Sequence, residues 1–516
     1  MKRTVQWLAV LFVVLFLAGC GESTGEAAEQ EAIEVPLEEQ SAANTTPGNE
    51  TNATEEVVLI KRPSITPETA REEAFQIARG NIITVALGSA LGIPFSLKEE
   101  QLEKILKAGE LENPPIKNWA LLERPFSTGN PKLLGKESLF YPSNYESFRF
   151  SSLSQRTEVK DFANAILAEA KLAKALLAGY DADAKFQAAL LGISAARKAN
   201  VFALDGKSGG FYFPMDEAGE LDDSSFALGE QLYVLLAFSE IKALTEEKQY
   251  FGEFRKTEAI GYANQLYNII KREEKQSNYE LFYSLDSHDL GMAVYAFASF
   301  AGITDDGKWQ QFALEDMGRI ANIILERMDD NGKMEKGMQS QLTTQATAVL
   351  GLLIAFENTD NEEYKQGAIE AWSYLQELWD ENAQLYRKEE DGDFAYSAEE
   401  IADVILAFNA VTEILGTEEG ERMADFFNSA VKLSGIQLSE MEDDTDEIPS
   451  TEENFLAPVF ATGFAYDEKK QEWRVTDKNF NTGQAMYLAA QLLNIGTYEE
   501  TPALEKGGLP KLFSLE

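Results

Sequence analysis

The feature that most constrains the fold of this chain is an alternation of two kinds of helical segment, which starts near Thr157 and continues almost to the end. One kind is apolar on nearly every face, as in YVLLAF at 233–238 and LGLLIAF at 350–356. The other kind is amphipathic, as in FRKTEAIGYANQLYNIIKRE at 254–273. A helix that is apolar all round belongs inside a protein, and a helix with one polar face belongs outside. The alternation therefore predicts an inner and an outer layer of helices.

Eleven such segments follow one another along the chain. We expect helices over 158–178, 183–199, 223–243, 254–273, 287–302, 308–328, 341–357, 361–379, 397–416, 418–433 and 481–495. Short links lead from each apolar segment to the next amphipathic one, and longer loops lead back. If the hairpins close into a ring, the long loops all lie at one end, and a helix within 61–92 supplies the twelfth member. An open stack of hairpins is the structural alternative.

Two short motifs recur at equivalent places in this pattern. Near the start of three apolar segments the motif is G-x-x-x-Y, with Gly229 and Tyr233, Gly291 and Tyr295, and Gly483 and Tyr487. Because glycine costs helix stability, its recurrence indicates close packing of helix backbones. In the long loops the motif is D-x5-aromatic, with Asp205 and Phe211, Asp380 and Tyr386, and Asp467 and Trp473. Aspartate at a turn and an aromatic residue on the returning arm predict small β-hairpins at this end.

The alternation, with a D…GGFY run before an inner helix, resembles the (α/α)6 toroids of six helical hairpins. That run is formed by Asp205, Gly209, Gly210, Phe211 and Tyr212. Many glycoside hydrolases, the N-acylglucosamine 2-epimerases and the helical domains attached to thioredoxin-like modules share this architecture. The resemblance covers about 157–495 and implies an all-α fold with inner and outer rings. The epimerases use a pair of catalytic histidines, whereas this chain has only His288, and residues 1–150 contain no C-x-x-C.

The first twenty residues have the layout of an export signal. Lys2 and Arg3 precede an apolar run at 7–17, which is shorter than the roughly 20 residues of a membrane-spanning helix. LAGC at 17–20 resembles the lipobox of prokaryotic lipoproteins, which implies cleavage before Cys20 and a diacylglycerol group on its thiol. A structural or reactive cysteine is the alternative. We therefore expect an extracytoplasmic protein that is anchored to the cell membrane by lipid.

Composition divides the chain into four stretches. Residues 1–19 form the predicted signal peptide. Residues 20–60 follow as an acylated cysteine and a disordered acidic tether, because 21–60 contain ten glutamates and no lysine, arginine or aromatic residue. Residues 61–150 predict a helical segment and an irregular connector, and the toroid occupies 151–516.

Two local patterns add to this outline. IITVALGSALGIPF at 82–95 suggests a buried helix, and Ser96-x-x-Glu99 suggests a capping box that opens the next helix. The acidic run at 439–453 is either a solvated surface excursion or a calcium-binding loop, although it lacks the spaced aspartates of known calcium loops.

Charge and residue counts exclude several classes of site. The formal net charge of −42 disfavours nucleic acid and anionic lipid surfaces as partners, because both attract basic patches. Removing the two basic residues of the signal and the ten glutamates of the tether leaves −34 for 61–516. The single cysteine excludes internal disulfides, catalytic thiols and cysteine zinc sites, and the single histidine excludes sites with two imidazoles. We expect no metal and no cofactor, and the sequence carries no signal for an oligomeric state.

Polar and aromatic residues gather at the predicted long-loop end, where the free N–H groups of the inner helices create a concave site. We expect an acid/base pair from Asp222, Asp223, Asp286 and Asp289. We expect ligand-binding side chains from Phe211, Tyr212, His288, Tyr386, Tyr396 and Trp473. Glu399 and Glu400 lie at the same end. Each aspartate has the alternative role of a helix cap, and the aromatic residues have the alternative role of fixing loops to the ring.

Carboxylates beside aromatic rings suit carbohydrate, because glycosidic cleavage needs one carboxyl group as acid and another as base or nucleophile. The first functional hypothesis is a membrane-anchored protein that hydrolyses an oligo- or polysaccharide. The second is a non-catalytic lipoprotein that binds glycan or protein, or serves as a scaffold.

Overall fold

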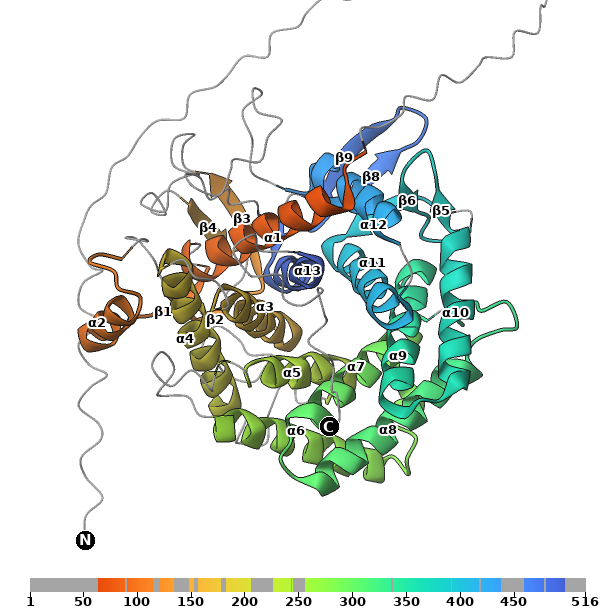
Figure 1. Ribbon diagram of the computed structural model, residues 1–516, viewed down its shortest axis with the longest axis horizontal. Helices are drawn as coiled ribbons and strands as arrows, with labels where there is room; N and C mark the ends of the chain where they lie inside the picture. Colours follow the sequence, from red (N-terminus) through yellow and green to blue (C-terminus); the bar gives the residue numbers. More distant parts are fainter. Residues whose placement is uncertain are drawn as a thin grey trace, which may run out of the picture. The chain divides into compact units, whose positions relative to one another are not determined.

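Six inner helices form a closed ring in the computed structural model. They are α3 (Val159–Leu177), α5 (Leu228–Glu240), α7 (Ser287–Ile303), α9 (Gln341–Thr359), α11 (Ala398–Ala410) and α13 (Thr482–Ile495). Each packs against the next in this order, and α13 packs against α3, so that the ring has no open edge (Figure 1). The structure describes residues 64–88, 91–114, 121–133, 148–152, 156–177, 182–205, 226–242, 244, 256–335, 337–390, 392–416, 419–437, 459–477 and 479–496.

Six further helices surround this ring. They are α1 (Pro67–Ile83), α4 (Ala182–Asp205), α6 (Lys256–Gln276), α8 (Gly307–Glu326), α10 (Glu362–Glu377) and α12 (Gly420–Phe427). Five of these outer helices each pack on the inner helix that directly precedes them in the chain, namely α4, α6, α8, α10 and α12. Helix α1 packs instead on α13 and α12 (Figure 1). The fold is therefore the predicted (α/α)6 toroid, and the open stack is excluded.

The ends of the helices follow local sequence signals. Asp286, Ser340, Ser397 and Asn481 each accept a hydrogen bond from a backbone N–H in the first turn of α7, α9, α11 and α13. These caps satisfy donors that an α-helix leaves free at its start. The predicted segments 397–416 and 418–433 contain α11 and α12, and each of these helices continues into a π-helical turn, Val411–Leu415 and Asn428–Leu433.

Glycine in the G-x-x-x-Y motif allows neighbouring inner helices to approach closely. A Cβ atom on Gly291 of α7 would lie 1.9 Å from the carbonyl oxygen of Thr347 of α9. On Gly229 of α5 it would lie 2.5 Å from a carboxylate oxygen of Asp289. Real Cβ atoms do not approach other atoms this closely, so the motif has the packing role that the sequence suggested.

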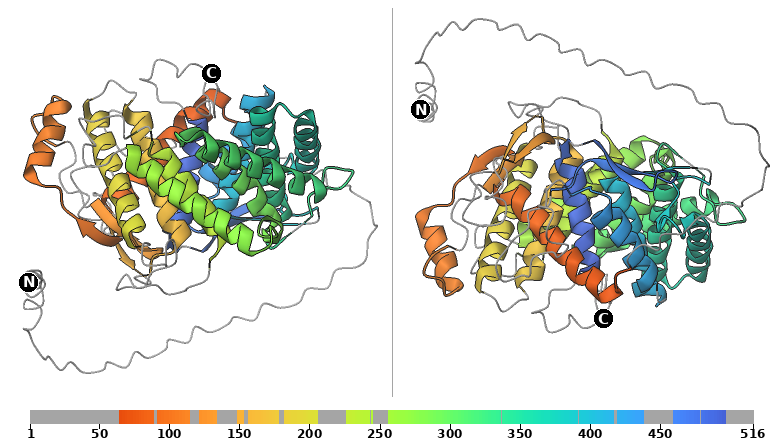
Figure 2. Two further views of the ribbon diagram at one scale, coloured as in Figure 1. Left: turned by 90° about the horizontal axis from the view of Figure 1, so that it is seen from below. Right: turned by 90° about the horizontal axis from the view of Figure 1, so that it is seen from above.

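Small antiparallel sheets lie at one end of the ring, as the two side views show (Figure 2). Strands β5 (Trp379–Asp380) and β6 (Leu385–Tyr386) form one hairpin, and β8 (Gly463–Asp467) and β9 (Glu472–Asp477) form another, to which β7 (Phe394–Ser397) adds. Both hairpins confirm the prediction from the D-x5-aromatic motif. The copy at 205–211 extends beyond the described residues.

The connector between α1 and α3 is more ordered than the sequence indicated. Strands β3 (Thr128–Leu133) and β4 (Phe148–Ser152) pair with each other, and β3 also pairs with β10 (Phe480–Asn481), which directly precedes α13. The backbone N–H of Thr482 donates to the carbonyl oxygen of Ser127 at 2.9 Å. The connector is therefore joined to the last hairpin of the toroid.

Two local predictions for this region were wrong. Residues 82–95 do not form one buried helix, because α1 ends in a π-helical turn, Thr84–Gly88, and β1 (Gly92–Phe95) pairs with β2 (Leu121–Pro125). Gly92 has a φ of 152°, and a Cβ atom there would lie 2.1 Å from the Arg124 carbonyl oxygen, so this crossing requires glycine. Helix α2 (Glu99–Ala108) is present, but it does not begin with a Ser96–Glu99 capping box. The backbone N–H of Lys98 instead donates to the side-chain oxygen of Gln101, at 3.0 Å.

No helix in the part of the chain that the structure describes combines the length and apolar character needed to cross a membrane.

Candidate functional site

Seven polar side chains from five inner helices meet inside the ring, and we call them the axial cluster. They are Lys160 of α3, Tyr233 of α5, His288 and Asp289 of α7, Glu399 and Asp403 of α11, and Tyr487 of α13. Several of their contacts join helices that are not neighbours in the ring. Such contacts run across the interior of the ring.

His288 links α7 to α11 through two carboxylates. Its Nε2 atom lies 3.1 Å from Asp403 Oδ2, and its Nδ1 atom lies 3.0 Å from Asp289 Oδ1. The hydroxyl of Tyr487 donates to the other oxygen of Asp403 at 3.0 Å. Both ring nitrogens of His288 are thus engaged, so the imidazole orients carboxylates and does not itself face a ligand.

Lys160 and Glu399 form the second ion pair of the cluster, between α3 and α11. The ammonium group of Lys160 also lies over the ring of Tyr233, 4.3 Å from its centroid. The rings of Tyr233 and Tyr487 meet edge to face with centroids 5.7 Å apart. The two ion pairs and the two tyrosines therefore form one connected layer across the ring.

Solvent reaches one side of this layer. The side chains of Asp289, Lys160 and Glu399 are 28%, 27% and 20% exposed, whereas those of His288 and Asp403 are 3% and 1% exposed. The three exposed groups belong to the first turn of their helices, at the end where the long loops lie. A ligand that enters from this end meets two carboxylates and one ammonium group.

The charges of the cluster support one another. Burial lowers the pKa of His288, but the carboxylates of Asp403 and Asp289 outweigh this effect and raise the pKa to about 10. Burial also opposes ionisation of Glu399, but Lys160 and His288 together hold the pKa of Glu399 below its usual range. Burial lowers the pKa of Lys160, but Glu399, Tyr233 and Asp403 together outweigh this effect and raise the pKa. At neutral pH His288 and Lys160 are therefore cationic, and Glu399 is anionic.

The structure separates the two described aspartates that the sequence suggested as an acid/base pair. Asp289 belongs to the axial cluster. Asp286 caps α7 by accepting from the His288 N–H at 3.1 Å, and its second oxygen accepts from the Met338 N–H at 2.6 Å. Asp286 therefore has the capping role that was its alternative. Asp222 and Asp223 lie outside the described residues, as do Phe211, Tyr212, Cys20 and the acidic run at 439–453.

The predicted rim aromatics occupy other places. Tyr386 and Tyr396 are 0% and 2% exposed, and both rings pack against Phe426 of α12. Neither ring is therefore available to a ligand at the rim, and the prediction for these two residues is corrected. Trp473 is partly buried, with its ring 4.7 Å from that of Tyr466, so it fixes a loop hairpin as in the alternative role.

Sequence reasoning missed Lys160 and Asp403 and did not assign the two tyrosines a chemical role. The signal for Asp403 was present, because it is the one charged residue in the otherwise apolar run IADVILAF at 401–408. Glu399 was recognised at the correct end of the molecule but not as a principal candidate.

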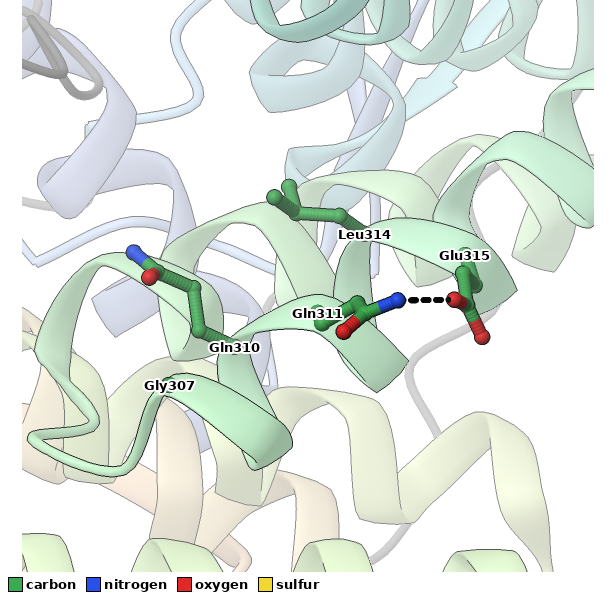
Figure 3. A pocket seen from close by; sticks show the side chains of 5 residues that line it. All are labelled: Gly307, Gln310, Gln311, Leu314 and Glu315. Atoms are coloured by element: carbon green, nitrogen blue, oxygen red, sulfur yellow. Dashed lines mark hydrogen bonds between the residues drawn. The ribbon is translucent and has the colours of Figure 1, made fainter.

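Metal-binding groups and surface pockets are two other kinds of site. Among the residues that the structure describes, no three His, Cys, Asp or Glu side chains are grouped to hold a metal ion. A shallow pocket of 460 Å³ is lined by Gly307, Gln310, Gln311, Leu314 and Glu315 of the outer helix α8 (Figure 3). The Gln311 amide donates to Glu315 at 2.8 Å within this pocket, and none of its lining residues belongs to the axial cluster.

No known family matches the sequence, and no curated protein matches it. The solved structures similar to this chain include cellobiose 2-epimerase from Bacillus thermoamylovorans B4167, with a TM-score of 0.47 and 11% identity over 66% of this chain and 88% of that chain. D-mannose isomerase has a TM-score of 0.45 and 13% identity, covering 77% and 96%. A variant of the unsaturated glucuronyl hydrolase from Streptococcus agalactiae has a TM-score of 0.40 and 10% identity, covering 85% and 95%.

Proposed function

We propose that this protein is a carbohydrate-active lipoprotein whose ligand binds at the exposed side of the axial cluster. The observation that supports this most directly is the presence of solvent-accessible ion pairs inside the helical ring. Apolar side chains of similar volume would generally stabilise such a position as well or better, because charges lose hydration on burial. Charged groups kept there are better explained by a ligand than by stability.

The exposed groups suit the chemistry of a sugar. Carboxylates accept hydrogen bonds from sugar hydroxyls, and the ammonium group of Lys160 donates to sugar oxygens. In hydrolysis, Glu399 is the carboxylate suited to take a proton from water or to attack the anomeric carbon, because its pKa is low. The glycosidic oxygen would take its proton from Asp222 or Asp223 in the preceding long loop, because Asp289 is paired with the cationic His288.

A non-catalytic glycan-binding role is the second candidate, and one observation favours it. Each exposed carboxylate already has a cationic partner, since Glu399 pairs with Lys160 and Asp289 pairs with His288. Paired carboxylates hold their charge and suit hydrogen bonding to a ligand more than proton transfer. The two candidate functions use the same site, but only the first predicts that the bound sugar is hydrolysed.

A hydrolysis and binding screen with oligosaccharides separates them. We expect the wild-type protein to release reducing ends from at least one substrate, and Glu399→Gln and Asp289→Asn to reduce the rate at least 100-fold. Asp222→Asn and Asp223→Asn test the proton donor in the same assay. Glu315→Gln, on the outer face of α8, is the matched control and should retain full activity. Binding without turnover would support the second candidate, and neither binding nor turnover would refute both.

The membrane anchor is proposed from the lipobox resemblance of residues 17–20. The mature protein should fractionate with membranes and label with a fatty-acid probe. Cys20→Ser should remove the label and release the protein from the membrane fraction. Unchanged partitioning of the variant would contradict the lipid anchor and leave the proposal for the axial cluster intact.

A further inference from the structure

Tyr233 carries a buried hydroxyl that makes no hydrogen bond to any residue the structure describes, although its side chain is 1% exposed. Burial raises the pKa of this group, so the hydroxyl keeps its proton and remains a donor. A buried donor without a partner lowers stability, and phenylalanine would fill the same space without that cost.

The hydroxyl faces the axial cluster. The charged groups whose fields act on it are Lys160, Glu399, Asp403 and Asp289. Lys160 lies over the ring face, and its side chain is 27% exposed, so a flexible lysine separates Tyr233 from solvent. A lysine stem can move without any change in helix packing, and a ligand that displaces it reaches the tyrosine.

Tyr487 provides an internal comparison. It occupies the same position of the G-x-x-x-Y motif in α13 that Tyr233 occupies in α5, and their rings are in contact. The Tyr487 hydroxyl donates to Asp403 at 3.0 Å, so it supports the network. The two tyrosines occupy equivalent positions but differ in one respect. Among the residues that the structure describes, the Tyr487 hydroxyl has an acceptor and the Tyr233 hydroxyl has none.

We propose that the Tyr233 hydroxyl is a ligand-contacting group, which donates a hydrogen bond to an oxygen of a carbohydrate that displaces the Lys160 stem and lies beside Glu399. The ligand supplies an acceptor where the described side chains around the hydroxyl supply none. This inference rests on the proposed function and adds a specificity-determining residue to the same site.

The test compares Tyr233→Phe with Tyr487→Phe in the mature full-length protein. Calorimetric titration with cellotetraose, maltotetraose, xylotetraose and chitotetraose measures affinity, and chemical denaturation measures stability. We expect Tyr233→Phe to weaken binding at least tenfold while the denaturation midpoint stays the same or rises. Tyr487→Phe should lower the midpoint, because it leaves Asp403 Oδ1 without the donor that Tyr487 supplies.

The outcomes separate this inference from the proposal on which it rests. If the wild-type protein binds none of the four sugars, both fail. If the wild-type protein binds and Tyr233→Phe binds equally well, only the role of Tyr233 fails. A fall in the midpoint of Tyr233→Phe comparable with that of Tyr487→Phe would show a structural hydroxyl, and would also overturn the inference.

Discussion

His288 is a buried histidine that carries a positive charge in the folded protein. Its imidazolium lies between Asp403 and Asp289, 3.1 Å and 3.0 Å away, and these carboxylates more than compensate for its burial. In the unfolded chain the same histidine loses its proton near pH 6.5. Its protonation is therefore linked to folding.

We predict that alkaline pH destabilises the protein through His288. Because the folded pKa of about 10 exceeds the unfolded value, the stabilising contribution is complete below pH 6.5 and is lost as pH rises through 10. In this window one extra bound proton in the folded state lowers the free energy of unfolding by about 1.4 kcal/mol per pH unit. Denaturant titrations at several pH values between 7.5 and 9.5 measure this slope.

His288→Gln is the control for this prediction, since glutamine does not titrate. Asp161 interferes little, because burial raises its pKa to about 7 and most of its contribution to the slope lies below the measured range. A slope that persists unchanged in His288→Gln would assign the linkage to other groups.

At the level of helices, the crossing of α7 and α9 depends on two glycines that face each other. A Cβ atom on Gly351 would lie 2.9 Å from the Gly291 Cα atom, and one on Gly291 would lie 1.9 Å from the Thr347 carbonyl oxygen. The backbone itself is the obstacle, so no side-chain rotation relieves the contact.

We predict that Gly291→Ala lowers the free energy of unfolding by about 3 kcal/mol, because α7 must move away from α9. Gly261→Ala is the matched control. It lies in the outer helix α6, where a Cβ atom meets nothing within 4 Å, and alanine should raise stability by about 0.5–1 kcal/mol through helix propensity. Thermal denaturation of both variants tests the pair. Equal effects would show that helix propensity, not the crossing, governs these positions.

The outer layer of helices is completed by α1, which comes before the inner helices in the sequence. Helix α1 packs on α13 and α12 near the other end of the sequence. Arg79 of α1 donates to Gln187 of α4 at 2.8 Å, and Glu73 pairs with Lys432, in the π-helical turn after α12, at 2.7 Å. The sixth outer position therefore joins the two ends of the toroid.

Removal of α1 should open the molecule. A protein that begins at residue 89 exposes apolar side chains of α13 that α1 helps to bury, and we expect it to aggregate or to unfold without a cooperative transition. A protein that begins at residue 61 keeps α1 and serves as the control. Size-exclusion chromatography and calorimetry compare the two, and a monodisperse shorter protein with an unchanged Tm would contradict this role of α1.

Much of this architecture was predictable because helical periodicity is a local property. The apolar and amphipathic segments specified the inner and outer helices, and the predicted bounds of α7 and α13 agree with the structure to within one residue. The hairpins at Asp380 and Asp467 followed from turn chemistry. The prediction of one helix over 82–95 was wrong because β1 pairs with the distant strand β2, and this pairing overrode the local apolar character.

The candidate site was harder to predict, because its members come from five helices that are far apart in the sequence. By itself the sequence determined the helices, their layers, the close-packed glycines and the end of the ring where polar groups gather. Only the tertiary structure decided that His288 pairs with Asp403, that Asp286 is a cap and that Tyr386 is buried. The physical reason is that amphipathic pattern and capping act within a few residues, whereas ion pairs across the ring depend on where its closure places each helix.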